Sequence, residues 1–106
     1  MASRWMVWLL LAASFAAAPG VFAQGVTMTW TVDGVQRTAL VFAPSPGPSV
    51  ASRRLPLIFA FHGHGGTSQT AAVGMHFQTL WPEAVVVYPQ GLKTPSKIDS
   101  NGDQYG

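Results

Sequence analysis

Apolar residues alternate with threonines where the folded part of the chain is expected to begin. Val26 to Asp33 reads Val-Thr-Met-Thr-Trp-Thr-Val-Asp, and this period of two predicts a half-buried antiparallel strand. Asp33-Gly34 is a strong hairpin signal, since both central positions of a type I′ turn need positive φ. The pattern therefore predicts an edge hairpin whose return strand is Val35 to Phe42, with Arg37 at an exposed position.

Two later runs are apolar without alternation, which is typical of strands buried on both faces of a parallel sheet. They are Leu55 to Phe61 and Ala84 to Tyr88. Between them, Ser68 to Trp81 has helical spacing, with Thr67 or Ser68 as the N-cap and Pro82 ending the helix near Trp81. Strand, helix and strand in this order predict a βαβ unit with a parallel strand pair and a right-handed crossover. The apolar face expected on this helix consists of Val73, Phe77, Leu80 and Trp81.

The remaining segments are expected to be loops. Ala43 to Arg54 is rich in Pro, and Leu92 to Gly106 is polar without periodicity. One hairpin and one βαβ unit would leave much apolar surface uncovered. We therefore expect the chain to be the N-terminal part of a longer α/β protein, and a small complete domain is the alternative.

Residues Met1 to Ala23 have the pattern of a secretory signal peptide. Arg4 precedes an apolar stretch from Trp5 to Ala18, and Val21-Phe22-Ala23 offers a cleavage site. The stretch is short for a helix that spans a bilayer, although an uncleaved membrane anchor remains the alternative. We expect a secreted protein, extracellular or periplasmic, without stable membrane association after cleavage, whose folded part is residues 24–106.

Composition and charge exclude several classes of function. The chain has no Cys, which excludes a Cys nucleophile, disulfides and Cys-based metal sites. The formal net charge is only +2, and the basic pair Arg53-Arg54 lies in the Pro-rich loop. We therefore expect no nucleic-acid surface.

The motif His62-Gly63-His64-Gly65-Gly66 follows the first buried run directly. Its glycines allow positive φ and close approach of a ligand to the backbone, and amides before a helix N-terminus can point at a developing negative charge. A phosphate-binding loop would need a Lys here. A dinucleotide loop would need Gly in place of Ser68 and an acidic residue near Tyr88. The motif therefore favours an oxyanion hole.

Histidine side chains could also hold a metal. His62 and His64 are alternate residues, which would face the same way on an extended backbone, and His76 lies on the expected helix. No carboxylate is close in sequence to complete the set, so we expect no metal site. We expect His62 to hydrogen-bond backbone and hold the turn rather than to act as a catalytic base.

Two further signals are weaker. Asp99, Asn101 and Asp103 have the alternate spacing of a calcium loop, but Gln104 stands where that loop needs Gly, which favours a plain polar turn. The sequence contains no Gly-x-Ser-x-Gly, so it offers no identifiable serine nucleophile.

Leu55-Pro56-Leu57-Ile58 running into the glycine motif, followed by Val85-Val86-Val87-Tyr88-Pro89-Gln90-Gly91, resembles the secreted α/β-hydrolase esterases. This family includes polyhydroxybutyrate depolymerases and related feruloyl and acetyl-xylan esterases. The resemblance covers most of residues 24–106. It implies the N-terminal part of an α/β-hydrolase fold, with a β-hairpin followed by a βαβ unit of a mainly parallel sheet.

The resemblance also implies site residues and an activity. Backbone amides of Gly63, His64 and Gly65 would contribute to the oxyanion hole, with His62 and Gly66 shaping the loop. A Ser-Asp/Glu-His triad in that order would lie beyond Gly106, no cofactor is implied, and the polar stretch after Gly91 would lie near the active-site rim. Many relatives have cysteines, which this chain lacks.

The expected function is that of a secreted serine esterase or depolymerase, polyhydroxybutyrate depolymerase-like, acting on a polyester or a plant cell-wall ester. The 106 residues alone should be inactive, because the triad is expected elsewhere. Three alternatives stay open: a feruloyl or acetyl-xylan esterase, a peptidase of the same fold, or a non-enzymatic exported module whose glycine loop is only a turn.

Overall fold

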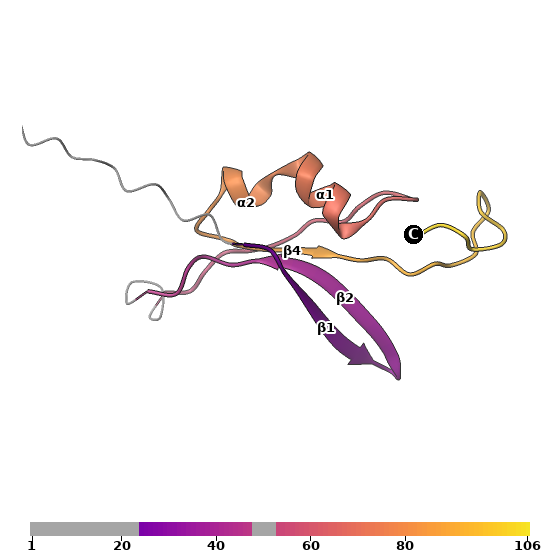
Figure 1. Cartoon of the computed structure of the whole chain (residues 1–106), viewed down its shortest axis with the longest axis horizontal. Helices are drawn as coiled ribbons and strands as arrows, with labels where there is room; N and C mark the ends of the chain where they lie inside the picture. The colour runs from indigo at the N-terminus through magenta and orange to yellow at the C-terminus, as the bar shows by residue number, and fades with distance from the viewer. Residues whose placement is uncertain (1–23, 48–52) are drawn as a thin grey trace, which may run out of the picture.

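The computed structural model describes residues 24–47 and 53–106, so the expected signal peptide at 1–23 and part of the Pro-rich loop at 48–52 lie outside the described residues. The strands form one mixed sheet in the order β1-β2-β4-β3, and both helices lie on one side of it (Figure 1). The chain is thus a small α/β structure. Its elements are β1 (Val26–Val32), β2 (Val35–Phe42), β3 (Leu57–Phe59), α1 (Ser68–Met75), α2 (Phe77–Leu80) and β4 (Val85–Pro89).

The predicted hairpin is confirmed. β1 and β2 pair antiparallel from Val26 opposite Val41 to Val32 opposite Val35, and the turn residues Asp33 and Gly34 have φ of 50° and 76°, as a type I′ turn needs. The prediction that β1 is half-buried is wrong, because all seven of its residues are exposed. β1 is the outer strand of the sheet, and the hairpin extends away from the helices (Figure 1).

Strand β4 lies between two partners at the centre of the sheet. It pairs antiparallel with β2 and parallel with β3, from Leu57 opposite Val85 to Phe59 opposite Val87. The parallel pair predicted from the strand–helix–strand pattern is therefore confirmed. Val86 and Tyr88 are fully buried on the face that the helices cover. The alternate residues Val85, Val87 and Pro89 are only half-buried, so the predicted burial on both faces is found on one face only.

Strand β3 differs from its prediction in length and in burial. The apolar run over 55–61 forms a strand only at Leu57–Phe59, and Leu57 and Phe59 are 58% and 57% exposed. The strand stands at the edge of the sheet. Ile58 packs against the core below the helices, while no element among the described residues covers the face that carries Leu57 and Phe59.

The single helix predicted over 68–81 is interrupted. Its N-terminus is as predicted, since the Thr67 side chain accepts a hydrogen bond from the Thr70 amide and the Thr70 side chain accepts one from the Thr67 amide, which together form a capping box. At His76, however, the backbone turns left-handed, with φ 54° and ψ 26°. This residue separates α1 from α2.

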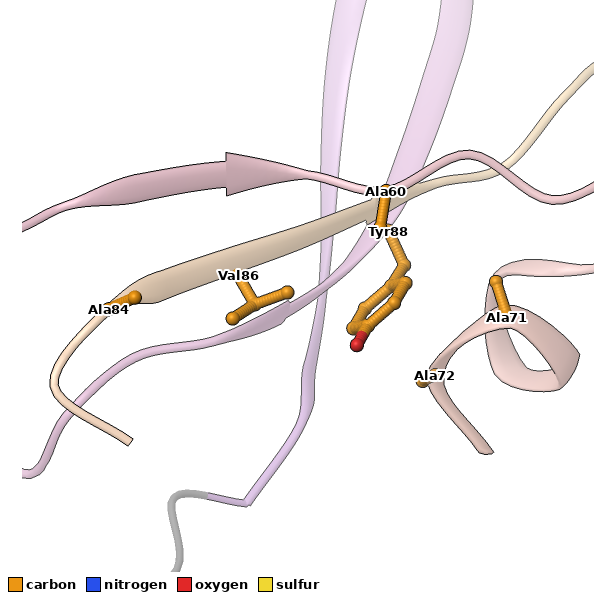
Figure 2. Packing of buried hydrophobic residues seen from close by; sticks show 6 residues of the cluster. All are labelled: Ala60, Ala71, Ala72, Ala84, Val86 and Tyr88. Carbon is orange, nitrogen blue, oxygen red and sulfur yellow. The ribbon is translucent and has the colours of Figure 1, made fainter. Parts of the chain in front are cut away.

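The predicted apolar face of the helix is wrong for three of its four residues. Val73 and Leu80 are 68% and 73% exposed, Trp81 is also exposed, and only Phe77 packs against the core. The buried residues of α1 are instead the small ones, which include Ala71 and Ala72. Figure 2 shows the reason: the ring of Tyr88 projects from β4 toward α1, and alanines let the helix approach it closely.

Candidate functional site

The glycine motif lies in the connection between β3 and α1. The strand pairing ends where the Ala60 amide donates to the Val87 carbonyl at 2.9 Å. A tight turn follows over 63–66, closed by the Gly66 amide donating to the Gly63 carbonyl at 2.9 Å. Gly65, the third residue of this turn, has φ 76°, which is the conformation that a type II turn requires there. The sequence around the motif thus folds into a type II turn directly before a helix.

His62 ties this turn to the segment that follows β4. Its Nδ1 lies 2.8 Å from the Gly63 carbonyl, and its Nε2 accepts a hydrogen bond from the Gly91 amide at 2.9 Å. A side chain on Gly91 would clash with the Gly106 carbonyl and would begin 3.1 Å from Cε1 of His62, so glycine there permits both close approaches. The His62 ring hydrogen-bonds backbone on both sides.

Gln90, directly after β4, forms a second link between the glycine turn and the segment that follows β4. The sequence pattern had predicted no role for this residue. Its Oε1 accepts a hydrogen bond from the Ser68 amide at 2.9 Å, and its Nε2 lies 3.3 Å from Nε2 of His62. Its own amide donates to the Thr38 carbonyl at 2.9 Å. The predicted parallel pairing could have placed Gln90 near the glycine motif, because parallel strands bring their carboxyl ends, and the residues that follow them, to one edge of a sheet.

The three amides expected to serve an oxyanion differ in their partners. The Gly65 amide donates to the Tyr105 carbonyl at 2.7 Å. Within the described part of the chain, the Gly63 and His64 amides donate no hydrogen bond, and both residues are exposed. Two of the three candidate donors are therefore free to bind a ligand oxygen.

A pocket of about 560 Å³ adjoins this site. Its lining combines apolar side chains, such as Phe61 and Leu92, with His62 and the guanidinium-bearing Arg37. A second pocket of about 590 Å³ is lined by Arg53, Trp81 and others, and contains no residue of the glycine motif. Of these two pockets, the one lined by His62 is therefore the one that can present a ligand near the turn.

The polar segment after Gly91 folds back on the motif. Lys93 and Tyr105 form an isolated bridge, and the Tyr105 carbonyl holds the Gly65 amide. Asp99 closes a turn within this segment, since its carboxylate accepts hydrogen bonds from the amides of Asp103 and Gln104 at 3.1 and 2.8 Å. These amides are the main reason that the pKa of Asp99 lies below its ordinary value of 3.8.

The residues that the structure describes do not form a metal site or an activated serine. The described ranges, 24–47 and 53–106, contain no group of three or more His, Asp or Glu side chains that could hold a metal ion. In the same ranges no hydrogen bond joins a serine to a histidine. Ser68 is buried, and its hydroxyl donates to the side chain of Gln69. Among residues 24–47 and 53–106, the helices are too short to span a membrane. The site can stabilise charge, and its residues include no activated nucleophile.

No family model, no curated protein and no solved structure matches this chain. The chemistry that the site supports follows from its own geometry. That geometry consists of a type II turn at the carboxyl end of β3, two unengaged amides at Gly63 and His64, and a pocket lined by the preceding residue, His62.

Proposed function

We propose that this chain supplies the oxyanion-hole loop of a secreted serine esterase with an α/β-hydrolase fold. The observation that carries the proposal is the pair of unengaged amides, Gly63 and His64, in the turn between β3 and α1. In α/β-hydrolases one amide of the oxyanion hole comes from the loop between the third strand and the first helix. The element order of this chain gives the glycine motif the same place.

The turn suits this role because its amides are already oriented. A negative charge that develops on a carbonyl oxygen during ester cleavage is stabilised most by donors that need no reorganisation. The Gly63–Gly66 hydrogen bond and the His62 ring both hold the turn in place. The neighbouring capped N-terminus of α1 adds a favourable field for a negative charge.

The chemical step is that of a Ser-His-Asp/Glu esterase. A serine attacks the ester carbonyl, a histidine takes its proton and later protonates the leaving alcohol, and the acidic residue orients the histidine. Since Gly-x-Ser-x-Gly does not occur in this sequence, the nucleophile and its partners would lie outside residues 1–106. The substrate is a carboxylic ester, and the family resemblance points first to a polyester such as polyhydroxybutyrate.

The test exploits the geometry of the turn. His64 is the second residue of the type II turn, where Pro is favoured, so His64→Pro removes the His64 amide hydrogen without opposing the fold. His64→Ala removes the same side chain and keeps the amide hydrogen. If the His64 amide serves the oxyanion, His64→Pro lowers kcat of the full-length protein about 100- to 1000-fold, while His64→Ala stays near the unmodified protein.

The assay is hydrolysis of 4-nitrophenyl butyrate and of a polyhydroxybutyrate film by the full-length protein. Equal activity of His64→Pro and His64→Ala would exclude the His64 amide as a donor. Absence of ester hydrolysis by the unmodified protein, on both substrates and on feruloyl and acetyl esters, would contradict the proposed function as a whole.

A further inference from the structure

Gln90 connects three segments that meet beside the glycine turn. Its side chain contacts the first residue of α1 through the Ser68 amide and contacts the loop after β3 through His62. Its backbone is itself fixed, because its amide donates to the Thr38 carbonyl on β2 at 2.9 Å. The side chain is thus held by the sheet on one side and bridges helix and loop on the other.

The partners of Gln90 determine where each hydrogen of the network lies. The Ser68 amide can only donate, so the atom 2.9 Å from it must be Oε1, and Nε2 must face His62. His62 Nε2 then lies near two donors, the Gln90 side chain and the Gly91 amide. This nitrogen therefore carries no hydrogen. The hydrogen of the neutral ring is on Nδ1, which donates to the Gly63 carbonyl at 2.8 Å.

The network ends at the peptide group that matters for the proposed function. The Gly63 carbonyl accepts both the His62 Nδ1 hydrogen and the Gly66 amide. The Gly63 carbonyl and the His64 amide belong to one planar trans peptide, so their bonds point in opposite directions. Two donors that fix the carbonyl consequently fix the direction of the His64 N–H, away from the network.

We propose that Gln90 is a positioning residue, which acts through His62 to hold the peptide between Gly63 and His64 in the orientation that an ester oxyanion needs. The proposal rests on the proposed function and assigns Gln90 no contact with the substrate. Loss of the Gln90 side chain leaves the Gly91 amide as the remaining donor to Nε2 of His62, so the tautomer is kept. It removes the contact with Gln90 that limits movement of the ring. The hydrogen bond from Nδ1 to the Gly63 carbonyl is then held less firmly, and the peptide is oriented less well.

Two substitutions distinguish the contact of Gln90 with the Ser68 amide from its contact with His62. Gln90→Met keeps the length of the side chain and removes its polar contacts with the Ser68 amide, His62 and the Gly91 carbonyl. Gln90→Glu keeps an acceptor for the Ser68 amide, at a helix N-terminus where a carboxylate is favourable, but it cannot donate to His62. Gln36→Met is the matched control, because Gln36 lies exposed on β2 and is not part of the network.

The full-length protein is assayed with a neutral 4-nitrophenyl ester, with kcat expressed per titrated active site. Misorientation of a catalytic group costs up to about 100-fold, so both Gln90 variants should lose roughly 10- to 100-fold in kcat with KM nearly unchanged. Because only transition-state binding is affected, a boronate that mimics the tetrahedral intermediate should weaken by the same factor. The urea midpoint of Gln90→Glu should stay near that of the unmodified protein, and Gln36→Met should change neither quantity.

Four results would overturn the inference. The first is a Gln90→Met protein with a lower urea midpoint but normal kcat per site, since Gln90 would then only stabilise the fold. The second is a normal kcat in Gln90→Glu beside a reduced one in Gln90→Met, which would assign the effect to the Ser68 contact. The third is an equal loss in Gln36→Met. The fourth, an unmodified protein that hydrolyses no ester, would reject the proposed function as well and is seen before any variant is made.

Discussion

Replacing Tyr88 with Phe tests how β4 stabilises the interruption between α1 and α2. The Tyr88 hydroxyl donates to Oε1 of Gln78 at 2.6 Å and accepts the Phe77 amide at 3.1 Å. Phe77 is the first residue of α2, a helix that has no side-chain cap of its own. The hydroxyl therefore caps the first amide of α2 from the neighbouring strand β4.

The magnitude follows from these contacts. Tyr88→Phe keeps the ring and its edge-on contact with Phe42, whose centroid is 6.0 Å away, so the change removes only the hydroxyl. A buried donor left without a partner costs about 1–3 kcal/mol. Since Phe77 and Gln78 are only partly buried, water reaches them in part. We expect a loss of about 2 kcal/mol in the free energy of unfolding, which is about 30-fold in the unfolding equilibrium constant.

Urea-induced unfolding followed by circular dichroism measures this loss. Tyr105→Phe is the matched control, since Tyr105 is exposed and its ring contact with Lys93 does not use the hydroxyl; it should change stability by less than about 0.5 kcal/mol. A Tyr88→Phe protein as stable as the control would refute the view that the hydroxyl caps α2.

The pH dependence of the free energy of unfolding is a second test of the Tyr88 hydroxyl. Burial raises the pKa of Tyr88 above its ordinary value of 10.0, although the hydrogen bonds with Phe77 and Gln78 oppose the shift. The folded protein therefore keeps this proton after the unfolded chain has lost it. The resulting stability is complete below pH 10 and is lost as the pH rises through the folded pKa. The difference between Tyr88→Phe and the unmodified protein should consequently narrow above pH 10.

Three further predictions concern other parts of the chain. Asp99→Asn leaves only one acceptor for the amides of Asp103 and Gln104, so one of these amides should exchange hydrogen faster. In the unmodified protein, hydrogen exchange at these amides should likewise become faster as the pH falls below 3.8 through the lowered pKa of Asp99, because the carboxylate is then protonated. If neither amide exchanges faster in Asp99→Asn, the prediction is wrong. Gly74→Ala should stabilise the protein by about 0.5–1 kcal/mol in urea unfolding, because a side chain there meets nothing within 4 Å on a helix; destabilisation would refute this. Mass spectrometry of the exported protein should find Gln24 as its first residue, and an intact Met1 would favour the membrane anchor.

Local sequence signals predicted the hairpin and the central strand well. Asp33-Gly34 imposes its turn through φ alone, and the β-branched run from Val85 forms β4 because it can pair on both sides. These features depend on few residues that are close in sequence. For the same reason the Thr67 cap could be predicted from its neighbours.

The features that the sequence did not predict depend on contacts between different elements. His is among the residues enriched in the left-handed conformation, but the helical spacing over residues 68–81 continues through His76 and does not mark a break there. The Tyr88 hydroxyl, which binds the next amide, stabilises the break. The exposure of Leu57 and Phe59 could not be predicted either, because burial of a strand depends on which elements cover it. In the candidate site, the turn was predictable from its glycines, whereas the Gln90 link needed the spatial meeting of two strand ends.

The most direct test of the central claim is a crystal structure of the full-length protein after reaction with diethyl 4-nitrophenyl phosphate. We expect one phosphorylated serine whose phosphoryl oxygen accepts a hydrogen bond from the Gly63 or His64 amide. A protein that forms no adduct, or an adduct whose phosphoryl oxygen is bound elsewhere while both amides remain unengaged, would contradict it.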